Sequence, residues 1–106
     1  MEFKKVEKRA IEIGGMYGQL EEKKYGRKWG ASELLQGFMG DVGDLAKLIT
    51  AKEGMREIKD VDKKLEHELA DCLWAVMVIA NQYNIDLEKA FTKTMNELEG
   101  KLRIKN

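Results

Sequence analysis

The sequence of 106 residues contains no proline and only one cysteine, Cys72. Without proline, long uninterrupted helices are favoured. A single cysteine excludes a disulfide within the chain and fits a reducing compartment. The N-terminus lacks the apolar core of a signal peptide, and the longest apolar run, residues 72–80, is far short of the roughly 20 residues that span a bilayer. We therefore expect a cytoplasmic protein that does not cross a membrane.

The sequence also lacks an excess of charge of either sign. Lysine and arginine together number 19, aspartate and glutamate together number 19, and charged residues make up 36% of the chain. Nucleic-acid-binding proteins usually carry a basic excess, so we expect no nucleic-acid partner. The length fits one domain with a modest core, and no linker divides the chain, so residues 1–106 are interpreted as a single domain.

Apolar residues recur at helical spacing in four segments of the chain. The pattern predicts helices over residues 2–24, 32–52, 60–83 and 87–103. Ser32 and Asp86 are the expected N-caps of the second and fourth helices, and Gly54 follows the end of the second. The predicted fold class is all-α, a four-helix bundle with short connections.

Two of these helices carry carboxylates within their apolar faces. On a helical wheel, Asp41 lies inside the apolar arc of the second helix, with Asp44 about 60° to one side. Glu68 and Asp71 repeat this arrangement in the third helix, where residues 72–80 are apolar nearly all round. An ordinary amphipathic helix places its acids opposite the apolar stripe. We therefore expect these four carboxylates to point inward.

Inward carboxylates repel one another and are costly to desolvate, so they need protons, cationic partners or a metal ion. Oxygen ligands favour hard ions, which makes Mg²⁺ the natural candidate and Mn²⁺ its alternative. One acid pair on a helix is most often solvated decoration, whereas two such pairs on consecutive helices favour a metal site. Cys72 is interpreted as core packing. His67, about 100° from Glu68 on the wheel, is interpreted as a structural residue outside the site.

The residues around these acids resemble MazG-like nucleotide pyrophosphohydrolases of the all-α NTP pyrophosphatase superfamily. The resemblance covers roughly residues 26–98 and is carried by GDVGDLAKLI and HELADCLWAVMVIANQYNIDLEKAF. The family pattern is Glu-x-x-Glu on one helix and Glu-x-x-Asp on the next. By position, the resemblance implies that the metal ligands are Asp41, Asp44, Glu68 and Asp71.

The resemblance also implies an activity and an assembly. The activity is Mg²⁺-dependent cleavage of a (d)NTP to the (d)NMP and pyrophosphate, with house-cleaning of nucleotide pools as its role. The assembly is a homodimer or homotetramer in which helices of two chains complete the bundle. The proton of the attacking water would pass to Asp41 or Glu68. The expected substrate contacts are cations for the phosphates and an aromatic ring for the base: Lys64, Lys93, Lys101 and Trp29.

The first acid pair departs from the family pattern. Asp41 and Asp44 stand where the family has glutamates, and each is shorter by one methylene, roughly 1.5 Å of reach. Many members carry a glutamate just before the first ligand, where this chain has Gly40. Gly37, Gly40 and Gly43 fall beside the acids on the wheel, and each costs about 1 kcal/mol relative to alanine. Close approach by a neighbouring helix or by phosphates would explain them.

Two other functions fit the same residues. One is a non-catalytic, homo-oligomeric helical interaction module, for which the aspartates and Gly40 speak; it predicts no Mg²⁺ binding and no release of pyrophosphate. The other is an enzyme like phosphoribosyl-ATP pyrophosphohydrolase, which would keep the metal chemistry and change the substrate. Assays with (d)NTPs and with phosphoribosyl-ATP distinguish these two functions from hydrolysis of nucleoside triphosphates.

Overall fold

The computed structural model describes residues 2–105 and contains four helices. They are α1 (Phe3–Tyr25), α2 (Ala31–Lys52), α3 (Val61–Gln82) and α4 (Leu87–Lys105), and the described residues form no strand. The all-α class is confirmed, and each helix begins and ends within two residues of its expected position. Over these same residues, no helix is long and apolar enough to cross a membrane.

Local signals explain where two of the helices stop and start. Gly26 adopts a left-handed conformation with φ 81°, and its N–H donates to the carbonyl of Glu22 at 2.9 Å, which closes α1. At the start of α4, Oδ1 of Asp86 accepts a hydrogen bond from the N–H of Lys89 at 3.1 Å. This is the bond expected of an N-cap residue, so the expectation for Asp86 is confirmed.

The expected cap of α2 was wrong. The helix begins at Ala31, and its N-cap is Gly30, which has an extended backbone (φ −93°, ψ −172°) and no side chain to form a capping bond. Ser32 is already inside the first turn. An N-cap residue must have non-helical backbone angles, and here the backbone turns helical one residue before the serine.

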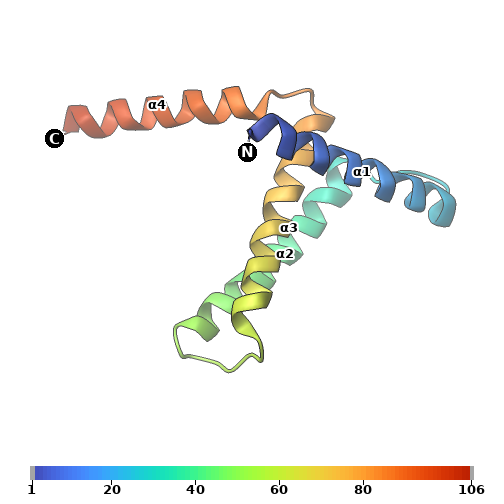
Figure 1. The fold of residues 1–106 in the computed structure, drawn as a ribbon, viewed down its shortest axis with the longest axis horizontal. Coiled ribbons are helices and arrows are strands. Elements are labelled where there is room, and N and C mark those ends of the chain that lie inside the picture. The colour runs from blue at the N-terminus through green and yellow to red at the C-terminus, as the bar shows by residue number, and fades with distance from the viewer. Residues whose placement is uncertain (1, 106) are drawn as a thin grey trace.

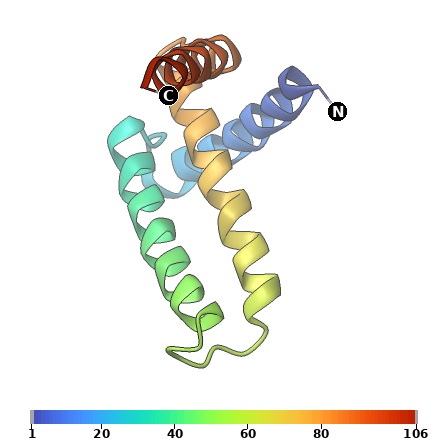
Figure 2. The ribbon, with the colours of Figure 1, turned by 90° about the vertical axis from the view of Figure 1, so that its left-hand side faces the viewer.

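Helices α2 and α3 form an antiparallel hairpin and lie side by side in both ribbon views (Figures 1 and 2). Nζ of Lys52, the last residue of α2, lies 2.6 Å from Oδ1 of Asp62 in the first turn of α3. The hairpin is thereby tied at the end where its connection lies. Because the two chains of the hairpin run in opposite directions, the middles of α2 and α3 face each other, and these are the segments that carry the acids.

Helix α1 crosses α3 at close range near Gly14. A Cβ added at Gly14 would lie 3.4 Å from both γ-carbons of Val78, so the backbone of α1 packs directly against this side chain of α3. Nε1 of Trp74 donates to the carbonyl of Ala10 at 3.0 Å across the same crossing. The buried apolar side chains of the described residues are Ala10, Leu48, Ala75, Met77, Val78 and Ala80. Helix α3 is the central element, because the last four of these belong to it.

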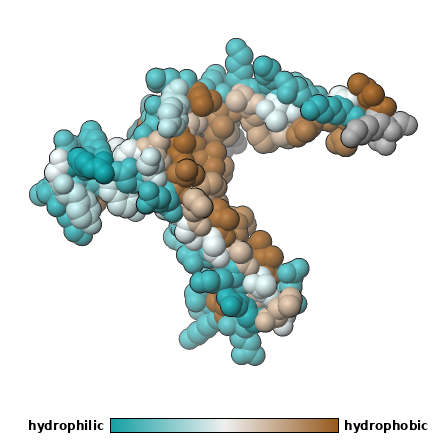
Figure 3. Space-filling model, turned by 180° about the vertical axis from the view of Figure 1, so that it is seen from behind, coloured by the Kyte–Doolittle hydropathy of each residue, from teal (hydrophilic) through white to brown (hydrophobic). Residues whose placement is uncertain are grey.

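Helix α4 leaves the end of α3 and runs away from the other helices (Figures 1 and 2). The radius of gyration is 16.9 Å, whereas a compact domain of this length has about 13 Å. Figure 3 shows apolar surface gathered in the angle between α4 and the hairpin, continuing along both. Large exposed apolar side chains recur along α4 at helical spacing and form an apolar stripe: Phe91, Met95, Leu98 and Leu102.

Candidate metal centre and adjoining pocket

Three of the four expected ligands converge across the α2–α3 hairpin, and Asp71 lies beside them. We call the four the acidic cluster: Asp41, Asp44, Glu68 and Asp71. One carboxylate oxygen from each of Asp41, Asp44 and Glu68 lies within 4.8 Å of the others. Asp41 and Glu68 are half-buried, as expected, whereas Asp44 is exposed, so the inward direction expected of all four acids is wrong for Asp44. The antiparallel packing of two helices, each with acids three residues apart, creates this convergence.

Asp71 lies at the edge of the cluster and has a partner of its own. Its Oδ2 is 3.0 Å from Nε2 of His67, one helical turn earlier on α3. His67 therefore contacts one of the expected ligands, and its interpretation as a structural residue stays a prediction. On the helical wheel His67 lies about 100° from Glu68 but only about 40° from Asp71, which places the side chains of His67 and Asp71 on one face.

Burial and mutual repulsion raise the pKa values of two carboxyl groups in the acidic cluster, those of Asp41 and Glu68. Burial raises the pKa of Asp41, and the neighbouring charges of Asp71 and Asp44 raise it further. The pKa of Glu68 is also raised, first by burial and then by Asp41, Asp44 and Asp71. The pKa of the Cys72 thiol is raised by burial and then by the carboxylates of Asp41, Glu68 and Asp71, which suits its expected role in packing.

The donor set fits a hard divalent cation. Oε2 of Glu68 is buried and has no hydrogen-bond partner, an arrangement that is rare for a buried polar atom. Within residues 2–105, no lysine or arginine forms an ion pair with Asp41, Asp44 or Glu68. The chain itself therefore leaves these charges uncompensated, and oxygen-only ligands are those preferred by Mg²⁺ and Mn²⁺.

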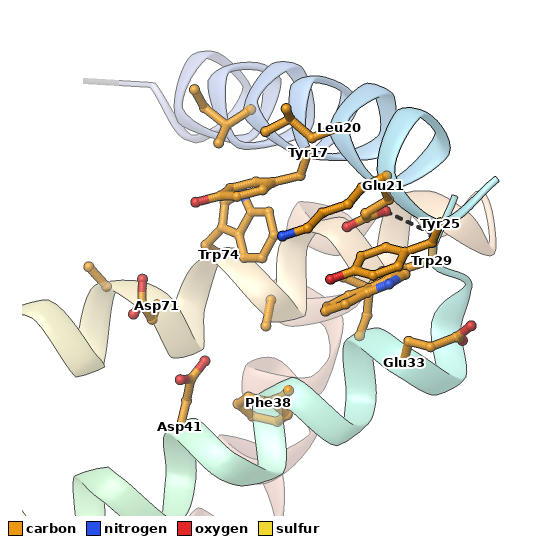
Figure 4. A pocket seen from close by; sticks show the side chains of 16 residues that line it. Tyr17, Leu20, Glu21, Tyr25, Trp29, Glu33, Phe38, Asp41, Asp71 and Trp74 are labelled. Carbon is orange, nitrogen blue, oxygen red and sulfur yellow. Dashed lines mark hydrogen bonds between the residues drawn. The ribbon is translucent and has the colours of Figure 1, made fainter. Parts of the chain in front are cut away.

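A cavity of about 760 Å³ adjoins the acidic cluster, and Asp41 and Asp71 line it (Figure 4). This volume lies within the range of small-molecule sites. Its other walls come from α1, the α1–α2 connection, α2 and α3. We call it the aromatic pocket after the rings that line it: Tyr17, Tyr25, Trp29, Phe38 and Trp74.

Two contacts order the walls of the aromatic pocket. The rings of Tyr17 and Trp74 pack edge to face, with centroids 5.7 Å apart and an angle of 63° between their planes. The backbone N–H of Trp29 donates to Oε1 of Glu21 at 2.8 Å, which fixes the α1–α2 connection against α1 (Figure 4). The aromatic pocket thus has mainly apolar, aromatic walls and is bordered by carboxylates of the acidic cluster.

Comparison with known proteins identifies the family. The family model for the MazG nucleotide pyrophosphohydrolase domain matches residues 31–102. The chain belongs to this family. The matched stretch contains the whole acidic cluster, whereas α1 and Trp29 precede it.

Among curated proteins, the MazG domain is similar to the Gene 37 protein of Mycobacterium phage L5. The two are 29% identical over 76 residues, which is 68% of this chain and 66% of the phage protein. The match therefore spans just under two thirds of that relative's length. No solved structure gives a significant match.

The expected substrate contacts of the MazG domain are placed unevenly. Trp29 lines the aromatic pocket, and Lys64 is exposed on α3 one turn before Glu68. Lys93 and Lys101 lie on α4, which runs away from the hairpin, so a single chain does not bring them to the acidic cluster (Figure 1). Their roles stay predictions.

The glycines of α2 do not approach another helix of the same chain. A Cβ added at Gly37, Gly40 or Gly43 would meet nothing within 4 Å. The expected close approach by a neighbouring helix is therefore wrong for a single chain. Space for phosphates or for a second copy of the chain remains as the explanation.

The α1 wall of the pocket was not anticipated from the sequence. Tyr17, Glu21 and Lys24 all line the pocket, and they lie three or four residues apart along α1. Such spacing places them on one helical face, so the signal was present in the sequence. It could not be interpreted before the crossing of α1 over α3 was known, because that crossing decides what the face looks onto.

Proposed function

We propose that this MazG domain hydrolyses nucleoside triphosphates to the monophosphate and pyrophosphate, with Mg²⁺ or Mn²⁺ held by the acidic cluster. The observation that carries the proposal is the buried, unpartnered Oε2 of Glu68, which belongs to a residue whose carboxylate converges with those of Asp41 and Asp44. When bound, such a cation neutralises phosphate charge and lowers the pKa of water. The activity suits a role in cleansing cytoplasmic nucleotide pools.

The side chains of the acidic cluster have two roles in this proposal, binding the cation and accepting a proton. Asp41, Asp44 and Glu68 supply converging oxygens, and Asp71 is the fourth ligand, oriented by the contact with His67. Asp41 or Glu68 takes the proton of the attacking water. Their raised pKa values favour this role, because a base is most effective when its pKa lies closer to the working pH.

The aromatic pocket gives the substrate its orientation. A nucleotide has a flat, weakly polar base at one end and an anionic chain of phosphates at the other. The pocket is built with the same polarity, because aromatic rings line its walls and Asp41 and Asp71 border it on the side of the acidic cluster. The base stacks against Trp29, and the exposed ammonium group of Lys64 attracts the phosphates.

A second copy of the chain completes the domain as a homodimer or homotetramer. The large apolar side chains Leu35, Met39, Leu69 and Leu73 are all at least half exposed on the hairpin, and α4 adds its own apolar stripe. Apolar surface that is this extensive marks an interface. A partner seated in the angle between α4 and the hairpin would bring its own cations, Lys93 and Lys101 among them, toward the acidic cluster.

The activity is tested with a panel of canonical and damaged (d)NTPs and phosphoribosyl-ATP in the presence of Mg²⁺. We expect pyrophosphate as the product. Release of orthophosphate alone, or the absence of turnover with either metal, would refute the proposal and favour a non-catalytic module. Glu68→Gln should abolish turnover, whereas Glu66→Gln, an exposed neighbour on α3, should not.

The assembly is tested by sedimentation. Leu98→Lys, in the apolar stripe of α4, should shift the protein toward monomer, and Glu99→Lys, beside it, should not. A wild-type protein that sediments as a monomer would refute the assembly.

A further inference from the structure

The α1 wall of the aromatic pocket offers hydrogen-bonding groups to the edge of a bound base. Glu21 and Lys24 both line the pocket and are one helical turn apart. Both precede residues 31–102, which the family model matches. The acidic cluster therefore lies within the matched family domain, while this wall lies outside the matched stretch.

Glu21 is the carboxylate that remains available at this wall. Its Oε1 accepts the backbone N–H of Trp29, and Oε2 has no hydrogen bond from any described residue. The other acids of the pocket are engaged: Glu33 is ion-paired with Arg27, and Asp41 and Asp71 belong to the acidic cluster. An ionised carboxylate only accepts hydrogen bonds, so Glu21 presents an acceptor beside the proposed stacking position on Trp29.

Lys24 adds a donor to the same wall. Its Nζ lies 5.6 Å from the centre of the Tyr25 ring, so the ammonium group is held over another ring of the pocket. A lysine ammonium only donates hydrogen bonds. The wall thus combines one acceptor and one donor within a single turn of α1.

Resting on the proposed function, we propose that Glu21 and Lys24 select the base of the substrate. Glu21 accepts a hydrogen bond from an exocyclic amino group, and Lys24 donates to a ring carbonyl. Cytosine and guanine carry both groups. Adenine has no carbonyl, and uracil and thymine have no exocyclic amino group, so the preferred substrates are cytosine and guanine nucleotides.

The deciding variant is Glu21→Gln. The amide oxygen of glutamine can still accept the N–H of Trp29, but the group then turned to the base is an NH₂ donor. We expect the ratio of kcat/KM for dCTP over dUTP to be at least about tenfold in the wild type and to fall by about tenfold or more in the variant, since an unmatched polar contact is strongly discriminating. Glu22→Gln is the matched control, because Glu22 is exposed and does not line the pocket.

A second measurement does not depend on turnover. Both tryptophans of the chain, Trp29 and Trp74, line the pocket, so their fluorescence reports occupancy. Titration with dCMP and dUMP in EDTA should give tighter binding of dCMP, and Glu21→Gln should remove or reverse that order. If Glu21→Gln fails to fold by circular dichroism, Lys24→Met replaces it, and the expected result is a rise of dATP relative to dCTP.

The outcomes separate this inference from the proposed function. Turnover with a dCTP-to-dUTP ratio that Glu21→Gln leaves unchanged overturns the base selection alone. No turnover of any nucleotide, together with dCMP-selective fluorescence quenching that the variant removes, overturns the proposed reaction and supports base selection. Equal binding of dCMP and dUMP by the wild type overturns base selection whether or not the protein hydrolyses nucleotides.

Discussion

Trp74 on α3 donates a hydrogen bond from Nε1 to the backbone carbonyl of Ala10 on α1, 64 residues earlier in the chain. The same indole packs edge to face on Tyr17 and lines the aromatic pocket. One side chain therefore fixes the crossing of α1 over α3 and forms part of the chamber that this crossing creates.

Replacing Trp74 with phenylalanine should lower the free energy of unfolding by about 0.5–1.5 kcal/mol, because the side-chain hydrogen bond that joins α3 to α1 is lost while the carbonyl of Ala10 keeps its bond within α1. Urea denaturation measures the change. Trp29→Phe is the matched control: the hydrogen bonds of Trp29 come from its backbone, so its loss of stability should be smaller. Equal losses in the two variants would contradict a special role for the Trp74 bond.

Replacing Asp41 with asparagine should raise the melting temperature when no metal is bound, because a half-buried charge beside Asp44 and Asp71 is removed. Functional sites commonly trade stability for activity in this way. Added Mg²⁺ should raise the melting temperature of the wild type, because ligand binding to the native state stabilises it, and should raise that of the variant much less. Calorimetry with and without EDTA measures both effects.

The control for this experiment is Glu66→Gln, which removes an exposed charge from α3 outside the cluster. Its response to Mg²⁺ should match that of the wild type. If neither Mg²⁺ nor Mn²⁺ changes the melting temperature of the wild type, the result would count against the metal centre.

The pairing of Lys4 with Asp86 should make part of the stability depend on acid pH. The hydrogen bond from Nζ of Lys4, 2.8 Å from Oδ1, is the main cause that lowers the pKa of Asp86, and the N–H of Lys89 assists it. A carboxyl with a lowered native pKa stabilises the fold above its ordinary pKa, near 3.9, and that contribution is lost as the pH falls through the lowered value.

Asp86→Asn should therefore be less stable than the wild type at pH 7, with a difference that shrinks as the pH falls below about 3.9. Asparagine is an equally good N-cap, so the start of α4 is retained and the charge alone is tested. Urea unfolding across this pH range measures the difference. A difference that persists unchanged at the lowest pH would argue against the ion pair as its source.

Replacing Gly40 with alanine should harm activity more than stability. A Cβ at this position meets nothing within 4 Å in the chain, and alanine is favoured over glycine in a helix by about 1 kcal/mol. Gly100→Ala on α4, which is equally open, is the control and should leave kcat/KM unchanged. Full activity in Gly40→Ala would show that neither substrate nor a second chain needs the space.

Local periodicity was sufficient to predict much of this architecture. The helix bounds, the cap at Asp86 and the inward direction of Asp41 and Glu68 all follow from spacing within one helix, and the structure confirms these local features. The convergence of Asp41, Asp44 and Glu68 required one further assumption, that consecutive helices pack antiparallel. A short connection makes that packing the ordinary outcome.

The rest depends on how distant segments meet, which spacing alone does not contain. The pocket exists because α1 crosses α3 at the contact of Gly14 with Val78, and no local pattern predicts that contact. The start of α4 lies beside α1, where Lys4 contacts Asp86, and the direction of the helix follows from the turn after α3. Lys93 and Lys101 were therefore placed on the correct helix without any basis for deciding which acids they approach.

The small core has a consequence for how much of the protein is folded at a given abundance. Its apolar side chains are mostly alanines and valine, with Leu48 and Met77 as the larger members, while many bulkier ones stay open to water. If copies of the chain shield that surface, association and folding are one equilibrium, and the melting temperature rises with protein concentration. Dilution would then unfold the protein, so that the rate of synthesis would set a threshold below which no folded protein accumulates.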